Sequence, residues 1–425
     1  MPTVPMFIRR QLLPLLANLK LAIALLLVIA CASILGTVIE QGESVAFYQQ
    51  NYPLKPALFG FLSYKVILTL GLNQVYHSWW YLCLLMLLAG SLLACTIHRQ
   101  IPLLKVANRW HFYRQPENIR KLPVTRELQN TTIEHLAEQL RCRGYRVFSS
   151  STGQLYARKG IIGRIAPIVV HISIIIILLG GVWGAFAGFS TQVLLPSGTS
   201  TNLEIPKHDW QVRVNHFWID YTPAGKIDQF YSDLSILDRD NHELTRKTIH
   251  VNEPLRYQGV TFYQASWDIS AIRFQVNRSP IFQLPLQKLS AKTNSSTVWG
   301  TWLPTKPDLS EGITLVTADL QGTFVIYGQD GKILTSIHTN QTQNINGVNL
   351  TIKEVIGATG LQIKSDPSVP LVYTGFALLM LSTIASYLSY SQVWAIQQGD
   401  TILIGGKTNR AQLQFTDEIQ HLLST

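Results

Sequence analysis

Residues 161–187 read IIGRIAPIVVHISIIIILLGGVWGAFA, and after Arg164 this stretch is almost wholly apolar for more than twenty residues. About 20 helical residues, each rising about 1.5 Å, cross a hydrocarbon core of about 30 Å, so the stretch predicts a transmembrane helix. It contains one histidine, His171. Because lipid offers an imidazole no hydrogen-bond partner, a histidine at this depth is a candidate functional residue.

The composition also indicates a membrane protein. The 425 residues are 47% hydrophobic and 14% charged, whereas soluble proteins average about 25% charged residues. The four cysteines form no C-x-x-C pair, and three of them lie in apolar runs, where free thiols behave as small hydrophobic side chains. A thiol–disulfide role is therefore disfavoured.

Three further apolar runs resemble the first, and the run from Leu21 to Val38 is too long for a cleaved signal peptide. The predicted spans are residues 19–39, 78–98, 164–187 and 370–391. The second opens with YHSWWY (Tyr76–Tyr81), an aromatic belt at one membrane face. In the connecting loop, residues 40–77, the segment Leu58–Leu72 has Lys65 at its middle and predicts an interfacial or packed helix rather than a span.

Charge fixes the predicted orientation. From Arg99 to Lys159 there are twelve Lys or Arg residues against four Asp or Glu, which indicates a cytoplasmic loop, together with the N-terminal residues 1–18. Much of the net charge of +10 is thereby explained without nucleic acid. Within this loop, residues 99–163, a T-x-x-E box at Thr131–Glu134 predicts the start of a helix and YRVFSS with QLYARKG a hairpin, which together predict a small α/β module.

Residues 188–369 have a different pattern. Short β-branched and aromatic segments alternate with turn sequences such as TPAGK and DRDN, and no cysteine is present. This predicts an all-β domain, sandwich-like or an irregular barrel, on the outer side. The predicted fold class is thus a multi-pass α-helical membrane protein with about four spans, a large all-β extracytoplasmic domain and a small α/β cytoplasmic module. Residues 392–425 are expected to form a cytoplasmic tail whose helix packs locally.

The third span carries a second feature, the glycines Gly180, Gly184 and Gly188 at every fourth position. Small residues at this spacing allow close approach of another helix, so they predict a surface for a partner helix. Ordinary glycine enrichment in membrane helices is the alternative.

His171 has three possible uses: a proton relay, a metal or haem ligand, or a hydrogen bond to a neighbouring helix. The spans contain no Asp or Glu, which weakens the relay hypothesis. A haem iron needs a neutral imidazole nitrogen in an apolar pocket, and the third span offers both. No second axial ligand lies at equal depth, which suggests that a partner supplies it. No zinc-binding histidine spacing is present.

Four motifs together resemble the ResB-like (CcsB) family of System II cytochrome c biogenesis, in its cyanobacterial and plastid branch. They are GTVIEQG after the first span, YHSWWY, the core HISIIIILLGG, and VNEPLRYQGVTFYQASW (Val251–Trp267). The resemblance covers nearly the whole chain. It implies a thylakoid membrane protein with its large domain in the lumen, an accessory subunit of a haem-attachment complex rather than a stand-alone enzyme.

The resemblance also implies partners and a cargo. Members act with a tryptophan-rich CcsA-type membrane protein, carry haem b transiently across the membrane and present it to C-x-x-C-H sites of apocytochromes c. His171 matches the family's span-three histidine and becomes the haem ligand candidate. His77, in YHSWWY, is a second candidate as a haem relay, with a structural role in the aromatic belt as its alternative. The WGTW at Trp299–Trp302 is interpreted as structural.

Other classes of function remain open from the sequence. One is a structural scaffold that stabilises the partner without binding haem. A second is a solute transporter, although inverted repeats and intramembrane charges are lacking. A third is an envelope sensor, for which no output motif is visible.

Overall fold

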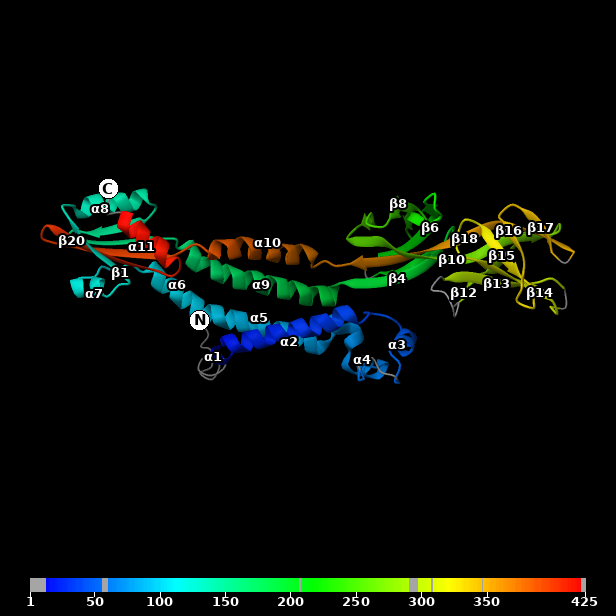
Figure 1. The fold of residues 1–425 in the computed structure, drawn as a ribbon, viewed down its shortest axis with the longest axis horizontal. Coiled ribbons are helices and arrows are strands. Elements are labelled where there is room, and N and C mark those ends of the chain that lie inside the picture. The colour runs from blue at the N-terminus through cyan, green and yellow to red at the C-terminus, as the bar shows by residue number, and fades with distance from the viewer. Residues whose placement is uncertain are drawn as a thin grey trace. The chain divides into compact units, whose positions relative to one another are not determined.

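The computed structural model describes residues 13–55, 60–205, 208–289, 297–306, 309–345 and 347–421. The chain divides into two compact units, Met1–Ala187 with Pro367–Thr425, and Gly188–Asp366 (Figure 1). Arg9 and Arg10, which contribute to the predicted charge asymmetry, lie outside the described residues. The four apolar helices and the large sheet-rich region that the sequence predicts are both present.

Four helices of the first unit are long and apolar enough to cross a membrane. They are α2 (Leu19–Val38), α5 (Trp79–Cys95) with its continuation, α9 (Ile162–Ala187) and α10 (Val369–Ser386). The second differs most from its predicted bounds, because it continues beyond residue 98 through the π-helical turn η3 (Thr96–Gln100) and α6 (Ile101–Asn108). Pro102 stands in the first turn of α6, where a missing N–H is tolerated, so this proline does not end the helix.

Helices α9 and α10 pack side by side and antiparallel (Figure 1). Glycines make this packing close. A Cβ on Gly180 of α9 would lie 2.6 Å from Val372, and one on Gly375 of α10 would lie 2.6 Å from Ile177. At the other end, a Cβ on Gly163 would lie 1.9 Å from the backbone oxygen of Leu388, so only glycine fits there.

The loop between α2 and α5 is folded rather than extended. It contains α3 (Val45–Asn51), α4 (Tyr64–Leu70) and the 3₁₀ helix η2 (Leu72–His77), while α1 (Leu13–Leu16) precedes α2. Tyr48, Ile67 and Val75 from these short helices are fully buried against α2 and α5. The prediction of a packed helix within 58–72 is confirmed for the described part of that segment by α4.

The first unit also contains a five-stranded sheet. Its order is β1 (Val124–Gln129), β20 (Thr401–Thr408), β19 (Ser391–Gln398), β3 (Gln154–Lys159) and β2 (Arg146–Ser150). The predicted hairpin is β2–β3, and the predicted helix of the tail packs on the strand that precedes it, but no strands were predicted in this tail. Strands β19 and β20 of that tail pair between β1 and β3 and complete the sheet.

Alternating side chains give this sheet two cores. On one face, Ala157, Val393 and Ile402 pack under α8 (Ile133–Cys142) and α11 (Gln412–His421). On the other face, Tyr156 and Trp394 pack with aromatic residues that precede and follow α7 (Pro116–Arg120). The predicted T-x-x-E box is wrong by one residue, since Thr132 caps α8 by accepting a hydrogen bond from the N–H of His135.

In the second unit, every described regular element from 188 to 366 is a strand. One sheet runs β11 (Phe282–Pro285), β10 (Val260–Val276), β18 (Val348–Ser365), β17 (Thr342–Ile345), with β4 (Phe189–Pro196) and β9 (Leu255–Tyr257) attached. A second runs β5 (Ser200–Ile205), β6 (His208–Tyr221), β7 (Ile227–Leu237), β8 (Glu243–His250). A third runs β12 (Gln287–Leu289), β13 (Val298–Pro304), β14 (Gly312–Thr317), β15 (Thr323–Tyr327), β16 (Ile333–His338).

These sheets enclose two cores rather than the single core of a two-sheet sandwich. The long paired strands β10 and β18 run through both. Phe262 lies in the core with β5–β8, whereas Phe274 lies in the core with β13–β16. Trp299 is buried in the second core and its indole N–H donates to the Asp268 carboxylate, which agrees with a structural role for this residue of WGTW, whereas Trp302 is exposed.

Candidate functional site

His171 lies half-buried in α9 with both ring nitrogens in contact with the α5–η3 helix. Its Nδ1 is 3.0 Å from Thr96 Oγ1 and 3.4 Å from the Leu92 backbone oxygen. Its Nε2 is 3.2 Å from Gln100 Nε2. Leu92, Thr96 and Gln100 are four residues apart, so they share one face of that helix. The interhelical hydrogen bond that was one of three hypotheses for His171 is thus present.

The hydroxyl of Thr96 determines which ring nitrogen of His171 carries the proton. It donates to the Leu92 oxygen at 2.9 Å, so its own oxygen accepts from Nδ1–H. Nε2 then accepts from the amide of Gln100. This arrangement is a neutral imidazole whose Nδ1–H is held by protein oxygens, as in most metal-binding histidines, and whose Nε2 lone pair can bind iron.

The π turn η3 is part of this site. In it, the N–H of Ile101 bonds to the oxygen of Thr96, five residues back. Pro102 has no N–H to offer, which interrupts the regular ladder at this level. Single π turns in long helices occur frequently at functional sites. Here the π turn spans Thr96 to Gln100, the two polar side chains that contact His171.

His77 ends η2, just before α5, and its side chain is exposed. Its Nδ1 donates to the backbone oxygen of Ala185 at 3.0 Å. Ala185 lies in the last turn of α9, where carbonyl groups lack helical partners, so His77 caps that helix. Among the described residues, no hydrogen bond to Nε2 of His77 is present, and this nitrogen is therefore available to a ligand.

Aromatic side chains are exposed close to His77 in the sequence, at the start of α5, and close to its partner Ala185 on α9. Trp79 is 78% exposed, and in α9 Trp183 and Phe186 are 50% and 77% exposed. Such side chains suit a membrane interface or a planar apolar ligand. Trp183 and Phe186 of α9 are therefore further candidates for the aromatic belt predicted from YHSWWY.

His171 and His77 belong to separate sites. On α9, 14 residues separate His171 from Ala185, the residue that His77 contacts, which corresponds to about 21 Å of helix rise. One iron cannot bind both histidines at that distance. The structure thus places the two candidates toward opposite ends of the α5–α9 pair.

The GTVIEQG motif holds η2, and with it His77. Gln41 donates to the oxygens of Ile39 and Leu72 and accepts from the N–H of Val75. The Glu40 carboxylate accepts the Tyr52 hydroxyl at 2.6 Å. This hydrogen bond lowers the pKa of Glu40, and burial together with the same bond raises the pKa of Tyr52 to about 12.

The predicted glycine surface has a partner in its own chain. Gly180 packs against Val372 of α10, and Gly188 lies one residue beyond the end of α9. Packing of another protein's helix on Gly184 stays a prediction.

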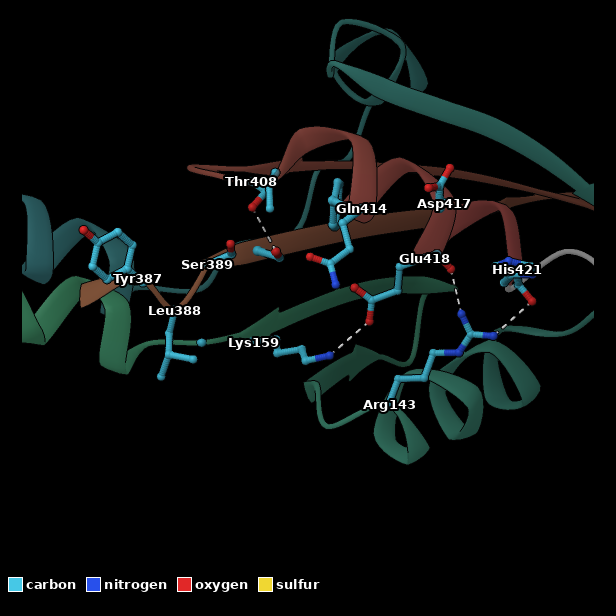
Figure 2. Close-up of a pocket in the computed structure, with 14 residues that line it drawn as sticks. Arg143, Lys159, Tyr387, Leu388, Ser389, Thr408, Gln414, Asp417, Glu418 and His421 are labelled. Carbon is cyan, nitrogen blue, oxygen red and sulfur yellow. Dashed lines mark hydrogen bonds and ion pairs between the residues drawn. The ribbon is translucent and has the colours of Figure 1, made fainter. Parts of the chain in front are cut away.

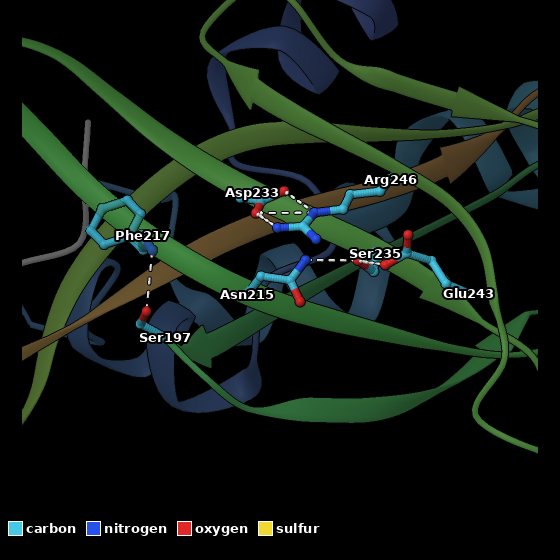
Figure 3. A network of polar contacts seen from close by, with 7 residues as sticks. All are labelled: Ser197, Asn215, Phe217, Asp233, Ser235, Glu243 and Arg246. Carbon is cyan, nitrogen blue, oxygen red and sulfur yellow. Dashed lines mark hydrogen bonds and ion pairs between the residues drawn. The ribbon is translucent and has the colours of Figure 1, made fainter.

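Polar clusters elsewhere have structural explanations. In the second unit, Arg246 binds the Asp233 carboxylate through Nε and Nη2, which lowers the pKa of Asp233 (Figure 3). Beside it, Asn215 donates to Ser235, which donates to Glu243. Both sets of contacts cross neighbouring strands of β6–β8 and fix their pairing.

A cavity of about 780 Å³ lies beside α11 in the first unit (Figure 2). Lys159 binds the Glu418 carboxylate at 3.1 Å, and Arg143 donates to the Glu418 backbone oxygen at 2.6 Å. These contacts fasten α11 to β3 and α8. The contacts of Lys159 and Arg143 in this wall thus have a structural explanation.

Comparison with known proteins agrees with the motifs. The ResB-like family model matches residues 19–301 and 315–420. The chain belongs to the ResB-like family. It is 52% identical over 98% of its length to the cytochrome c biogenesis protein CcsB of Nostoc sp., covering 93% of that protein. It is 54% identical over 99% of its length to the CcsB protein of Thermosynechococcus vestitus, covering 96% of that protein.

A solved structure, the cytochrome c haem lyase CcmF, was also matched. The match covers 86% of this chain and 39% of the lyase, at 10% identity and a TM-score of 0.25. A similarity this low supports no inference about fold or function.

Sequence reasoning missed Thr96 and Gln100. The predicted bounds put Thr96 at the inner end of the second span and Gln100 in the following loop, and neither residue was given a role. Two uncharged polar residues four positions apart, where an apolar helix reaches its polar end, are the signal that could have identified them, because such side chains form hydrogen bonds with a neighbouring helix.

Proposed function

We propose that this chain acts in the biogenesis of c-type cytochromes, as an accessory subunit that passes haem across the membrane for covalent attachment to apocytochromes. The observation that carries the proposal is its identity of 52–54% over nearly its full length to proteins named CcsB. The partner in the proposal is a CcsA-type membrane protein, and haem b is the cargo.

His171 is the proposed inner haem ligand. The contacts of Thr96 and Leu92 with Nδ1 support a neutral imidazole whose Nε2 lone pair can bind iron. His77 is a proposed outer relay position, supported by its available Nε2 and the exposed aromatic side chains on neighbouring segments. Haem held first at His171 and then near His77 would move outward by about 21 Å, most of the hydrocarbon thickness.

The proposed orientation puts the α/β module in the cytoplasm and Gly188–Asp366 in the thylakoid lumen. The excess of basic residues from Arg99 to Lys159 supports it. Two single-cysteine proteins test it in oriented membrane vesicles. Cys142, exposed on α8, should react with an impermeant maleimide from the cytoplasmic side, and Lys332→Cys, at a position 83% exposed, from the lumenal side. Labelling of both from one side contradicts the orientation.

Absorption spectra of the chain purified with its partner test the haem role. A Soret band that is lost in His171→Ala, with loss of holocytochrome and recovery on added imidazole, is the expected result. His77→Gln keeps a donor for the Ala185 oxygen but removes the ring nitrogen. Loss of holocytochrome in that variant supports the relay, and normal holocytochrome contradicts it.

A structural scaffold that binds no haem is the second candidate function. The observation that favours it is the hydrogen bonding of both His171 nitrogens to the α5–η3 helix. An unchanged Soret band in His171→Ala, together with reduced amounts of the partner in the membrane, is the outcome that supports the scaffold and contradicts ligation.

A further inference from the structure

The Gln100 side chain is hydrogen-bonded to Nε2 of His171, the nitrogen that would bind iron. The Thr96 hydroxyl donates to Leu92 and leaves its oxygen to accept from Nδ1–H. Nε2, with its lone pair, therefore faces Gln100 Nε2 at 3.2 Å, and the amide donates to it. A metal can bind this nitrogen only after the amide has moved away.

The oxygen of the same Gln100 amide lacks a hydrogen-bond donor among the described residues. This atom, Oε1, is buried. A buried polar atom left unsatisfied costs more free energy than an ordinary hydrogen bond gains, so this arrangement of Gln100 is only weakly favoured. Movement of the side chain toward a new donor is correspondingly easy.

The backbone under Gln100 also differs from a regular helix. Gln100 is the last residue of the π turn, and Pro102 follows two residues later. In contrast, Thr96 is buried and fixed by its own bond to Leu92. The two hydrogen bonds of His171 thus differ. The partner of Nδ1, Thr96, makes a second hydrogen bond of its own, whereas the partner of Nε2, Gln100, has a side-chain oxygen to which no described residue donates.

We infer that Gln100 is a displaceable gate on His171, which holds Nε2 in the absence of haem and leaves when iron binds. This inference rests on the proposed function. On binding, the Nε2–iron bond forms and the hydrogen bond from the Gln100 amide breaks, while the proton on Nδ1 stays with Thr96 and Leu92. Gln100 is a positioning residue in this scheme, because it acts through His171.

Hemin titration of the full chain, purified haem-free with its partner, tests the gate. Gln100→Leu removes the competing amide at similar size, and hemin should bind about three- to tenfold more tightly than to the wild type, as expected from loss of one competing hydrogen bond. Thr96→Val keeps the gate but removes the acceptor of Nδ1–H, so hemin should bind more weakly.

Two results separate the gate from the haem role itself. Unchanged or weaker binding in Gln100→Leu, when His171→Ala abolishes binding, overturns the gate and leaves the haem role intact. Unchanged binding in His171→Ala contradicts the haem role.

A measurement on the wild type without haem tests the gate even if the variants fold poorly. In the wild type labelled with ¹⁵N-histidine, Nε2 of His171 should resonate as an unprotonated nitrogen that accepts a hydrogen bond. A protonated Nε2 overturns the gate.

Discussion

His171 shows how a single polar residue is accommodated in an apolar helix. Its ring contacts α5–η3 through both nitrogens, so the polar group is shielded from lipid by a neighbouring helix. The same contacts set the tautomer that iron ligation requires. The hydrogen bond at Nδ1 is therefore compatible with a ligand role of Nε2, whereas the one at Nε2 must break first.

Thr96→Val tests how much the hydrogen bond between Thr96 and His171 contributes to stability. Loss of the hydroxyl should lower the free energy of unfolding by about 1 kcal/mol, typical of interhelical hydrogen bonds in membranes. Thermal unfolding in detergent measures the change. Thr374→Val is the matched control, since the Thr374 hydroxyl donates to the Pro370 oxygen within its own helix. Equal effects of the two substitutions contradict the prediction.

The Glu40–Tyr52 pair predicts a pH dependence. The pKa of Glu40 is lowered in the folded protein, so its contribution is present above about pH 4.5 and is lost as the pH falls. The pKa of Tyr52 is raised to about 12, so its contribution is present below about pH 10 and is lost as the pH rises through 12. Tyr52→Phe should lower the unfolding temperature at neutral pH.

The difference between Tyr52→Phe and the wild type should shrink as the pH falls below about 4 and Glu40 becomes protonated. Glu40→Gln keeps an acceptor that does not titrate, so it should flatten this trend. A difference that stays constant from pH 7 to pH 3 contradicts the assignment.

At the scale of elements, glycines decide how α9 meets α10 and the segment after it. The close contact at Gly163 is with backbone, which cannot move aside, whereas the contact at Gly180 is with the Val372 side chain. A Cβ on Gly181 meets nothing within 4 Å. The three glycines of α9 therefore differ in how well their positions can accommodate a Cβ atom.

Alanine substitutions test this order. Gly163→Ala should destabilise the protein by at least about 3 kcal/mol, Gly180→Ala by less, and Gly181→Ala hardly at all. Thermal unfolding and the yield of monodisperse protein in detergent measure the series. A Gly163→Ala protein as stable as Gly181→Ala shows that the close approach is absent.

At the scale of the whole molecule, each compact unit has its own cores. Gly188–Asp366 contains all strands of its three sheets, and its two ends meet where Phe189 pairs with Ser365. The other unit is discontinuous in sequence, since β19 and β20 join β1 and β3 across the inserted β region.

Residues 188–366 alone should therefore fold as a soluble protein with cooperative thermal unfolding, followed by circular dichroism. Phe262→Ala, which opens a cavity in one of its cores, should lower the unfolding temperature and serves as the control. A fragment without a cooperative transition contradicts the independence of this unit.

The features that depend on a local pattern could be predicted from the amino-acid sequence. Hydropathy and length identified the four apolar helices, β-branched alternation identified the strand-rich region, and four ordered motifs identified the family, because each signal is contained in a short stretch. Helix starts were harder, as Thr132 rather than Thr131 shows, since adjacent capping residues differ little in energy.

The contacts between distant segments of the chain could not be predicted in this way. The pairing of β19 with β3, the packing of Gly180 on α10 and the enclosure of His171 by Thr96 and Gln100 join residues that lie far apart in the chain. Such contacts depend on how whole elements pack, and no local periodicity encodes them. His171 could be identified from the sequence. Its tautomer and its contact with Gln100 depend on the α5–η3 helix, which packs against it.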